Sequence, residues 1–406
     1  MSTKGKIIND PVYGFIRFPE EGIMQLIDHP WFQRLRYIKQ MGSAHLVYPG
    51  AVHTRFHHSM GACHLMGKAL DELRAKGVEV TDDEYRAARI AILLHDIGHG
   101  PFSHALESTL VGDLSHEYIS QLIMNKLNDE FSGMLTEAIK VFNHSSGKHF
   151  LHQLVSSQLD VDRMDYLNRD SFYTGVSEGV IGYDRILQML TVKDNELLVE
   201  EKGVNSVEKF IIARRLMYWQ VYLHKTVFSS EILLINILKR AKSLARDGVE
   251  LFASPALRHF LYNNINKEQF EKEPEHLELY CKMDDIDVIS SIKAWCNHDD
   301  KILSRLCSMM QNRKLYKVLM TTGPVEDMAA EKRDILATEL KLKEEELDYL
   351  VCTGSTSEDT YNINNEKICI AMKNGDVKDI SEIDNPIINQ ALAKPVHKNY
   401  LCYLQP

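Results

Sequence analysis

Apolar residues recur along most of the chain at the three- and four-residue spacing that is typical of amphipathic helices. Met60, Cys63 and Leu70, for example, share one helical face. Thr81 followed by Glu84 forms a capping box, which marks the start of another helix. The pattern predicts helices over 21–26, 30–41, 59–76, 81–95, 115–127, 133–143, 150–169 and 206–245.

The pattern changes in the last third of the chain. Residues 284–310 and 326–350 are still predicted to be helical, whereas the small and polar residues of 353–360 favour a loop. Residues 367–377 contain Asn374-Gly375 between apolar segments and predict a hairpin. Residues 6–20 predict a short extended opening with a turn. We therefore expect a mainly α fold, with a helical core over 1–270 and a smaller α+β region over 271–406.

Composition limits the class of protein. The 406 residues are 44% hydrophobic and 26% charged, as in ordinary globular proteins. The formal net charge of -10 argues against a protein that coats duplex nucleic acid. The seven cysteines are scattered without a C-x-x-C pair, which favours reduced thiols in the cytoplasm. No apolar run is long enough for a signal segment or a membrane span, so we expect a soluble cytoplasmic protein.

The densest chemical information lies between residues 94 and 104. His95 and Asp96 end an apolar helix and place an imidazole beside a carboxylate, a mixed pair that suits a divalent metal. Gly98 and Gly100 follow and allow a close approach of backbone to a ligand. A His-Asp pair alone is weak evidence because such short motifs occur by chance. Three further histidines lie close by in the sequence, at positions 99, 104 and 116.

Two other segments supply further candidate ligands. His58 opens the helix before the His-Asp helix, together with Arg55, which suits either an anion or a structural salt bridge. Asp162 and Tyr166 share one face of a helix that apolar neighbours partly bury, and a buried acidic face requires a cation. Together with His95 and Asp96, His58 and Asp162 would provide four metal ligands and leave room for water and a phosphate oxygen. That arrangement favours metal-assisted phosphate hydrolysis.

A later helix joins cations with tyrosines. Arg214, Tyr218, Tyr222 and Lys225 share a face there, a combination that suits the phosphates, sugar and base of a nucleotide. On its own, an amphipathic helix with basic residues at its end is the simpler interpretation.

Taken together, these motifs resemble those of the HD superfamily, and in particular of its deoxynucleoside triphosphate triphosphohydrolases. The similarity is strong over about residues 6 to 240 and weak beyond. It is carried by Asn9-Asp10-Pro11, residues 32–40, Arg55-Phe56-x-His58-Ser59, residues 95–104, Ser115-His116-Glu117 and residues 160–166.

The resemblance implies a role for each matched residue. The metal ligands would be His58, His95, Asp96 and Asp162, and the ion would be Mg, Mn, Fe, Ni or Zn. The phosphates would be attended by Arg55, His99, His104 and His116, with Glu107 orienting a histidine. Arg163, Tyr166 and Arg214 would contact the triphosphate tail, and Gln40, Asp170 and Tyr222 the sugar, where Tyr222 would favour deoxyribose. The sequence departs from the family pattern at Arg163, Leu223 and His57.

The resemblance also implies regulation. An activating guanine nucleotide would bind through Lys6, Asp28, Gln33 and Arg36 at an interface of a dimer or tetramer. Polar residues on a helix that simply face solvent explain these positions equally well. Other HD-type nucleotide phosphohydrolases or phosphodiesterases, and a non-catalytic nucleotide- or nucleic-acid-binding protein, are the alternatives. The other HD-type enzymes fit less well, because an acidic pair shortly after Asp96 and a Gly-Tyr-Pro tripeptide are both missing from the sequence. A non-catalytic protein would be favoured if the purified protein held a nucleotide without turning it over.

Overall fold

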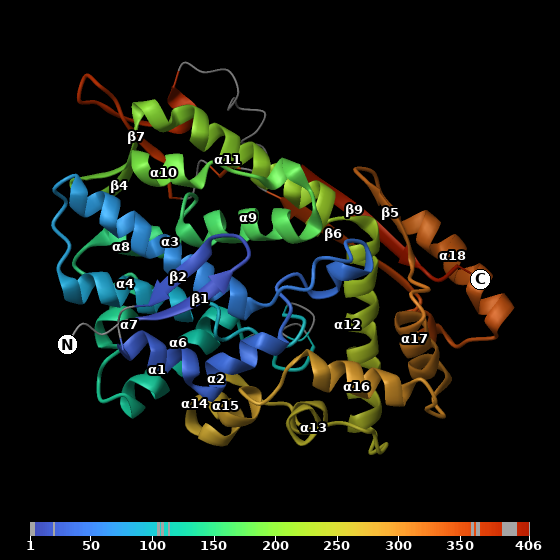
Figure 1. Cartoon of the computed structure of the whole chain (residues 1–406). Helices are drawn as coiled ribbons and strands as arrows, with labels where there is room; N and C mark the ends of the chain where they lie inside the picture. Colours follow the sequence, from blue (N-terminus) through green and yellow to red (C-terminus); the bar gives the residue numbers. More distant parts are fainter. Residues whose placement is uncertain are drawn as a thin grey trace.

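The structure is a computed structural model that describes residues 5–18, 21–103, 106, 109–112, 114–358, 361–362, 366–383 and 396–405. Helices form most of the molecule, and small sheets lie at its edges (Figure 1). The predicted mainly α class is confirmed.

The chain opens with a hairpin of β1 (Lys6–Asp10) and β2 (Gly14–Phe18). The side chain of Asp10 accepts hydrogen bonds from the backbone N–H groups of Val12 and Tyr13 and so closes the turn. Helices α1 (Glu21–Asp28) and α2 (Pro30–Gln33) follow, and a 3₁₀ turn spans Arg34–Tyr37. The predicted helix over 30–41 is therefore too long. Its last N–H groups, at Lys39 and Gln40, donate instead to Asp285 and to the carbonyl of His53.

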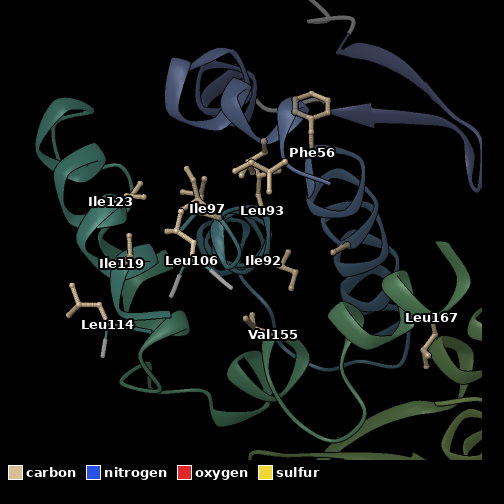
Figure 2. Packing of buried hydrophobic residues seen from close by; sticks show 14 of the residues in the cluster. Phe56, Ile92, Leu93, Ile97, Leu106, Leu114, Ile119, Ile123, Val155 and Leu167 are labelled. Atoms are coloured by element: carbon tan, nitrogen blue, oxygen red, sulfur yellow. The ribbon is translucent and has the colours of Figure 1, made fainter. Parts of the chain in front are cut away.

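Four helices surround the main core: α3 (Arg55–Ala75), α4 (Asp82–Leu94), α6 (His116–Glu130) and α7 (Thr136–Phe142). Thr81 and Glu84 form the predicted capping box of α4. Figure 2 shows Ile92, Leu93 and Ile97 between the helix that carries Phe56 and the helix that carries Ile119. Leu94, the last residue of α4, is buried, so the residue after it, His95, lies at the edge of the core.

Two helices that the sequence pattern predicts as continuous are broken. The segment 150–169 forms α8 (His149–Val155) and α9 (Val161–Thr174), because the Asp160 side chain caps α9 and also accepts from the Ser157 N–H. The segment 206–245 forms α11 (Val204–Met217), a π turn (Tyr218–Tyr222) and α12 (Lys225–Arg246). Helix α10 (Tyr183–Met189) and the hairpin of β3 (Leu190–Lys193) and β4 (Glu196–Glu200) lie between the two segments. The sequence pattern predicted no element between residues 169 and 206, so this hairpin was not predicted.

Among the described residues, the last third contains short helices and five strands. Its helices are α13 (Pro255–Tyr262), α14 (Lys267–Lys272), α15 (Pro274–Tyr280), α16 (Asp285–Trp295), α17 (Lys301–Gln311), α18 (Glu326–Leu340) and α19 (Glu344–Leu347). The predicted helices 284–310 and 326–350 are thus each divided in two. The side chain of Asp300 accepts from the Leu303 N–H and so starts α17 as a separate helix.

The segment 353–360, predicted as a loop, belongs largely to a strand. β6 (Val351–Glu358) and β5 (Lys317–Thr321) both pair antiparallel with β9 (Val396–Tyr403). Small polar residues form a strand here because β9 supplies hydrogen-bond partners, and because Gly354 leaves room for the Tyr400 ring. The predicted hairpin is confirmed as β7 (Cys369–Ala371) and β8 (Val377–Asp379).

Strand β7 also pairs in parallel with β4, so strands from both predicted regions form one sheet. The boundary at residue 270 stays a prediction. Within the described part of the chain, no single helix is both long and apolar enough to cross a membrane. One bent pair, Glu201–Tyr222 with Lys225–Arg246, meets the length and composition criteria at an angle of 60°.

Packing around α4 makes a stability prediction. Leu93 is fully buried, so Leu93→Ala removes apolar contacts and leaves a cavity. The expected loss in the free energy of unfolding is about 2–5 kcal/mol, measured by urea denaturation. Val180→Ala is the control, because Val180 is about half exposed and its truncation is expected to cost less than about 0.5 kcal/mol. Equal losses in the two variants would contradict this placement of α4.

Candidate functional site

The four predicted metal ligands converge where α3, α4 and α9 meet. The Nε2 atoms of His58 and His95 lie 3.0 and 3.3 Å from the same carboxylate oxygen of Asp162. One Asp96 oxygen lies 3.2 Å from His95 Nε2, and the other lies 3.8 Å from His58 Nε2. His58, His95 and Asp162 therefore form one group that could hold a metal ion, with Asp96 beside it.

The chemistry of this cluster fits a divalent cation. The Nε2 atoms of His58 and His95 are buried and make no hydrogen bond to any described residue. An imidazole nitrogen left this way in the interior is costly, and a metal ion would satisfy both. Two nitrogens with carboxylate oxygens suit a transition metal or zinc, and the donor set does not identify one ion. The carboxylates also carry the negative charge that such an ion balances.

A chain of buried charges orients His58. Its Nδ1 lies 2.8 Å from Asp165, and Asp165 accepts two hydrogen bonds from Arg169, at 2.9 and 3.0 Å. Arg169 also donates to Asp10 in the N-terminal hairpin, at 2.8 Å. Because Nδ1 is occupied in this way, Nε2 faces the cluster. His95 is fixed similarly, since its Nδ1 contacts the Ile92 carbonyl at 2.7 Å.

These contacts shift the pKa values of the cluster. Burial alone would lower the pKa of His58, but Asp162 and Asp165 raise it to about 10. Burial would raise the pKa of Asp96, but His95, His99 and Arg55 hold it well below its usual range. The lowered pKa keeps the Asp96 carboxylate ionised, whereas the raised pKa favours a proton on His58. A metal ion that binds at Nε2 would compete with that proton.

Asp96 also connects the cluster to the predicted phosphate-binding residues. Arg55 donates to Asp96 at 2.6 Å and to the Ser103 hydroxyl at 2.7 Å. The salt bridge between Arg55 and Asp96 thus lies inside the site. His99 Nε2 lies 3.4 Å from Asp96, and its ring stacks on His116 with 3.7 Å between centroids. Two other predicted residues, His104 and Glu107, lie outside the described residues.

One cavity opens at the cluster, and a second lies close to it, beside Arg55. The first, of about 550 Å³, is lined by His95, Asp96, His116, Asp162 and Arg163 among others. The second, of about 370 Å³, is lined by Gln40, Arg55, Tyr166, Asp170 and Tyr222, with Met41, Ala44, Val221, Leu223 and Val227 among its other residues. The predicted sugar-side residues thus all line the second cavity, whereas the predicted phosphate-side residues are divided, with His116 and Arg163 at the first cavity and Arg55 and Tyr166 at the second. Leu223, where the sequence departs from the family pattern, belongs to the apolar part of the second cavity.

Two further predicted contact residues, Tyr222 and Tyr166, line this second cavity. The Tyr222 hydroxyl donates to Asp170 at 2.7 Å. Burial and the neighbouring Asp170 raise the pKa of Tyr222 well above its usual value, so the phenol stays a donor. Burial also raises the pKa of Tyr166, and the charges of Arg163 and Arg214 oppose that rise. Arg214 therefore acts on Tyr166 electrostatically, although it is not among the residues that line either cavity.

Residues from the C-terminal third support the loop after His95. Tyr280 donates to the Gly98 carbonyl at 2.7 Å, and buried Arg34 donates to the Ile97 carbonyl at 2.7 Å. Asp285 accepts from the N–H groups of Lys39 and Phe102, at 3.0 and 3.1 Å. One carboxylate thus joins the segment before Gln40 to the segment before Ser103. Burial raises the pKa of Asp285 to about 6, against the effect of these two hydrogen bonds.

Sequence reasoning missed Asp165, Arg169, Tyr280 and Asp285 as parts of the site. The i, i+4 spacing of Asp165 and Arg169 was a usable signal for an ion pair on one helix face. Nothing in the local sequence indicated Tyr280 or Asp285, because each contacts a segment more than 180 residues away.

The four predicted activator residues lie on the surface near the hairpin. Lys6 and Asp28 form an ion pair at 3.7 Å, and both side chains are more than half exposed. Gln33 donates to the Ile27 carbonyl at 2.7 Å and accepts from Arg36 at 2.7 Å. The Arg36 guanidinium also lies over the Phe56 ring, 3.7 Å from its centroid. The four residues thus form two contacting pairs, Lys6 with Asp28 and Gln33 with Arg36.

Comparison with known proteins places this site in a family. The HD domain model matches residues 55–170, and an HD associated region matches residues 181–247. The uncharacterized protein YwfO of Bacillus subtilis is 36% identical over 339 residues, which cover 81% of this chain and 75% of that protein. The crystal structure of a phosphohydrolase from Bacteroides thetaiotaomicron is 50% identical and superposes with a TM-score of 0.95, covering 99% of this chain and 100% of that one.

The protein therefore belongs to the HD-domain family of metal-dependent phosphohydrolases. A similar protein with a named activity is the deoxynucleoside triphosphate triphosphohydrolase SAMHD1 homolog of Dictyostelium discoideum. It is 33% identical over 289 residues, which cover 66% of this chain but only 56% of that protein. The family resemblance inferred from the motifs is confirmed.

Gly61 gives a direct test of the charge chain behind His58. A Cβ atom at Gly61 would lie 2.1 Å from both Arg169 Nη2 and Asp165 Oδ1. Helix propensity alone favours alanine by about 1 kcal/mol, but disruption of a buried ion pair costs about 3 kcal/mol or more. We expect Gly61→Ala to lower both the melting temperature and the bound metal per chain, measured by calorimetry and elemental analysis.

Gly67→Ala in the same helix is the matched control. Its added Cβ would lie 3.1 Å from the Tyr85 hydroxyl and at ordinary contact distance, 3.6 Å, from Arg89 Nε. This variant is expected to keep its metal and its melting temperature. Unchanged metal content and stability in Gly61→Ala would show that the chain of charges does not hold His58 in place.

Proposed function

We propose that the protein hydrolyses deoxynucleoside triphosphates to the deoxynucleoside and inorganic triphosphate. The observation that carries the proposal is that the cluster opens into one cavity, while Arg55, which donates to Asp96, lines a second cavity of different character. One cavity presents Asp170, Gln40 and Tyr222, which suit a sugar, beside an apolar part that suits a base. The other presents Arg163 and His116, which suit phosphates. The activity named for the Dictyostelium relative supports the same substrate class.

In this proposal a nucleotide lies across the cluster, with its α-phosphate at the ligands. Arg55 sits between the cavity and Asp96 and would neutralise charge on that phosphate. When bound, the divalent ion supplies further charge stabilisation on the phosphate. Asp96 and Asp162, as predicted metal ligands, would hold the ion that helps to position the attacking water.

The leaving 5′ oxygen requires a proton. His116 and His99 lie next to Asp96 as a stacked pair, and His104 follows in sequence. We assign this proton transfer to His104 or His116, because an imidazole can carry a proton near neutral pH. Arg163, Tyr166 and Arg214 would then hold the triphosphate tail, and Tyr222 would favour a sugar without a 2′-hydroxyl. Arg163 stands where the family pattern has a lysine, so it would contact the triphosphate tail through a planar guanidinium rather than through a point charge.

Product analysis tests the reaction. The metal-loaded protein is incubated with each dNTP and NTP, and the products are resolved by ion-exchange chromatography. We expect deoxynucleoside and intact inorganic triphosphate in equal amounts. Asp96→Ala should lose both bound metal and turnover while its circular dichroism spectrum stays unchanged, because Asp96 contacts both histidine ligands.

The other outcomes identify the alternatives. Early release of orthophosphate with a deoxynucleoside diphosphate would show attack at the γ-phosphorus and would refute the proposal. Retention of nucleotide without turnover by the metal-loaded protein would indicate a non-catalytic nucleotide-binding protein.

We also propose that a guanine nucleotide activates the enzyme by binding near Lys6, Asp28, Gln33 and Arg36. The Asp28 carboxylate can accept from the guanine edge, and Lys6 and Arg36 can supply charge to phosphates. Because a ligand shifts an equilibrium only through differential affinity, binding at an interface should favour a dimer or tetramer.

The activator proposal predicts linked changes in rate and mass. Adding GTP should raise both dNTP turnover and the oligomer mass measured by light scattering. Asp28→Ala should remove both effects and leave basal turnover unchanged, because Asp28 is exposed and paired only weakly, with Lys6. Unchanged rate and mass with every nucleotide tested would show that these residues serve the fold alone.

A further inference from the structure

His53 lies directly behind the wall of the sugar-side cavity. Its side chain is completely buried, and its Nε2 contacts an Asp170 oxygen at 2.7 Å. The other Asp170 oxygen accepts from the Tyr222 hydroxyl, also at 2.7 Å. Asp170 and Tyr222 line the cavity, whereas His53 does not. His53 is thus a buried group that reaches the cavity only through Asp170.

The contacts assign the proton on the His53 ring. A carboxylate only accepts hydrogen bonds, so Nε2 must carry a hydrogen and donate it to Asp170. The Nδ1 atom is buried and makes no hydrogen bond to the described residues. The His53 ring stacks on Tyr173, with centroids 4.4 Å apart and an angle of 17° between the planes. Stacking and burial leave the imidazole one orientation, and therefore one direction in which to donate.

The backbone of His53 holds a second wall of the same cavity. Its carbonyl accepts from the Gln40 N–H at 3.0 Å, and the neighbouring Lys39 and Thr54 form an antiparallel bridge. The backbone N–H of Arg55, two residues after His53, donates to the Ile38 carbonyl at 2.9 Å. His53 therefore sets the position of Gln40 through its carbonyl and of Asp170 through its ring.

Two donors hold Asp170 in a single orientation. An ionised carboxylate has about four acceptor positions, and the bonds from His53 and Tyr222 occupy one on each oxygen. The remaining positions of a carboxylate that lines the cavity can accept from a hydroxyl group of a ligand. Without the His53 donor, the Asp170 carboxylate could rotate about its side-chain bonds, and that acceptor position would no longer be defined.

We propose that His53 is a positioning residue through which the protein selects nucleotides that carry a 3′-hydroxyl on the sugar. The proposal rests on the proposed function, because it takes the ligand of this cavity to be a deoxynucleotide. His53 does not touch the substrate. Its ring orients Asp170 toward the sugar, so loss of the ring donor affects recognition of one hydroxyl more than the reaction at phosphorus.

The test compares each dNTP with its 2′,3′-dideoxy analogue, which differs only by the 3′-hydroxyl. His53→Phe keeps an aromatic ring for Tyr173 but removes the donor, whereas His53→Gln keeps an N–H donor at a similar reach. For the wild type we expect kcat/KM to favour the dNTP by about tenfold or more, the effect of one hydrogen bond to a charged group. His53→Phe should bring this ratio close to one, and His53→Gln should retain most of it.

A purely structural role for His53 predicts a different result. In that case His53→Phe would lower kcat/KM for the dNTP and its dideoxy analogue by the same factor, and the ratio would stay unchanged. That result overturns the proposal, as would loss of the ratio in His53→Gln alone. Melting temperature and bound metal are measured for both variants, to confirm that the fold and the metal-ligand cluster persist.

A binding measurement separates this proposal from the proposed function. Dissociation constants for the same pairs are measured by calorimetry in EDTA. If the wild type binds dNTPs without hydrolysing them, the hydrolase proposal fails, and the ratio of dissociation constants across the variants decides the role of His53. If the wild type neither binds nor hydrolyses dNTPs, both proposals are wrong.

Discussion

The candidate site depends on one buried run of charges, from Asp10 through Arg169 and Asp165 to His58. Asp165 and Arg169 are completely buried, and each charge in the run has a partner of opposite sign. Loss of any member would leave an unpaired charge in the interior, so the whole run must form for the fold to be stable. Its last member, His58, is thereby oriented with Nε2 toward the other ligands. The same interaction joins the N-terminal hairpin to α3 and α9.

Close backbone packing completes the geometry. Glycines occur where helices approach the ligands: a Cβ at Gly98 would lie 2.2 Å from the His116 carbonyl, and one at Gly61 would collide with the charge run. Ser120 donates to the His95 carbonyl and accepts from the Gly98 N–H, so α6 holds the loop that follows His95. Tyr280 and Asp285, which come from the C-terminal third of the chain, contact the same loop. The loop that carries Asp96 is therefore fixed by these neighbours as well as by its own backbone hydrogen bonds, such as that from the His99 N–H to the Asp96 carbonyl.

This arrangement accounts for how an acidic protein can take an anionic substrate. The formal net charge is -10, yet the groups around the cluster include Arg55, Arg163 and several imidazoles. Bulk charge governs solubility and encounter, whereas a phosphate responds to charges within a few ångströms. In the proposed function, the cavity at the cluster would take the phosphates and the cavity lined by Arg55, Asp170 and Tyr222 would take the nucleoside.

The sequence by itself determined the features that depend on neighbours along the chain. The Thr81–Glu84 capping box, the helix that ends at His95 and the β7–β8 hairpin are local, and their motifs predicted them. The ligand residues could be named because motif spacing resembles a family. Only tertiary structure decided the break before Asp160, the strand at 351–358 and the roles of Asp165, His53 and Asp285. Strand partners and partners of buried charges come from segments far apart in sequence, and local pattern carries no information about which segments will meet.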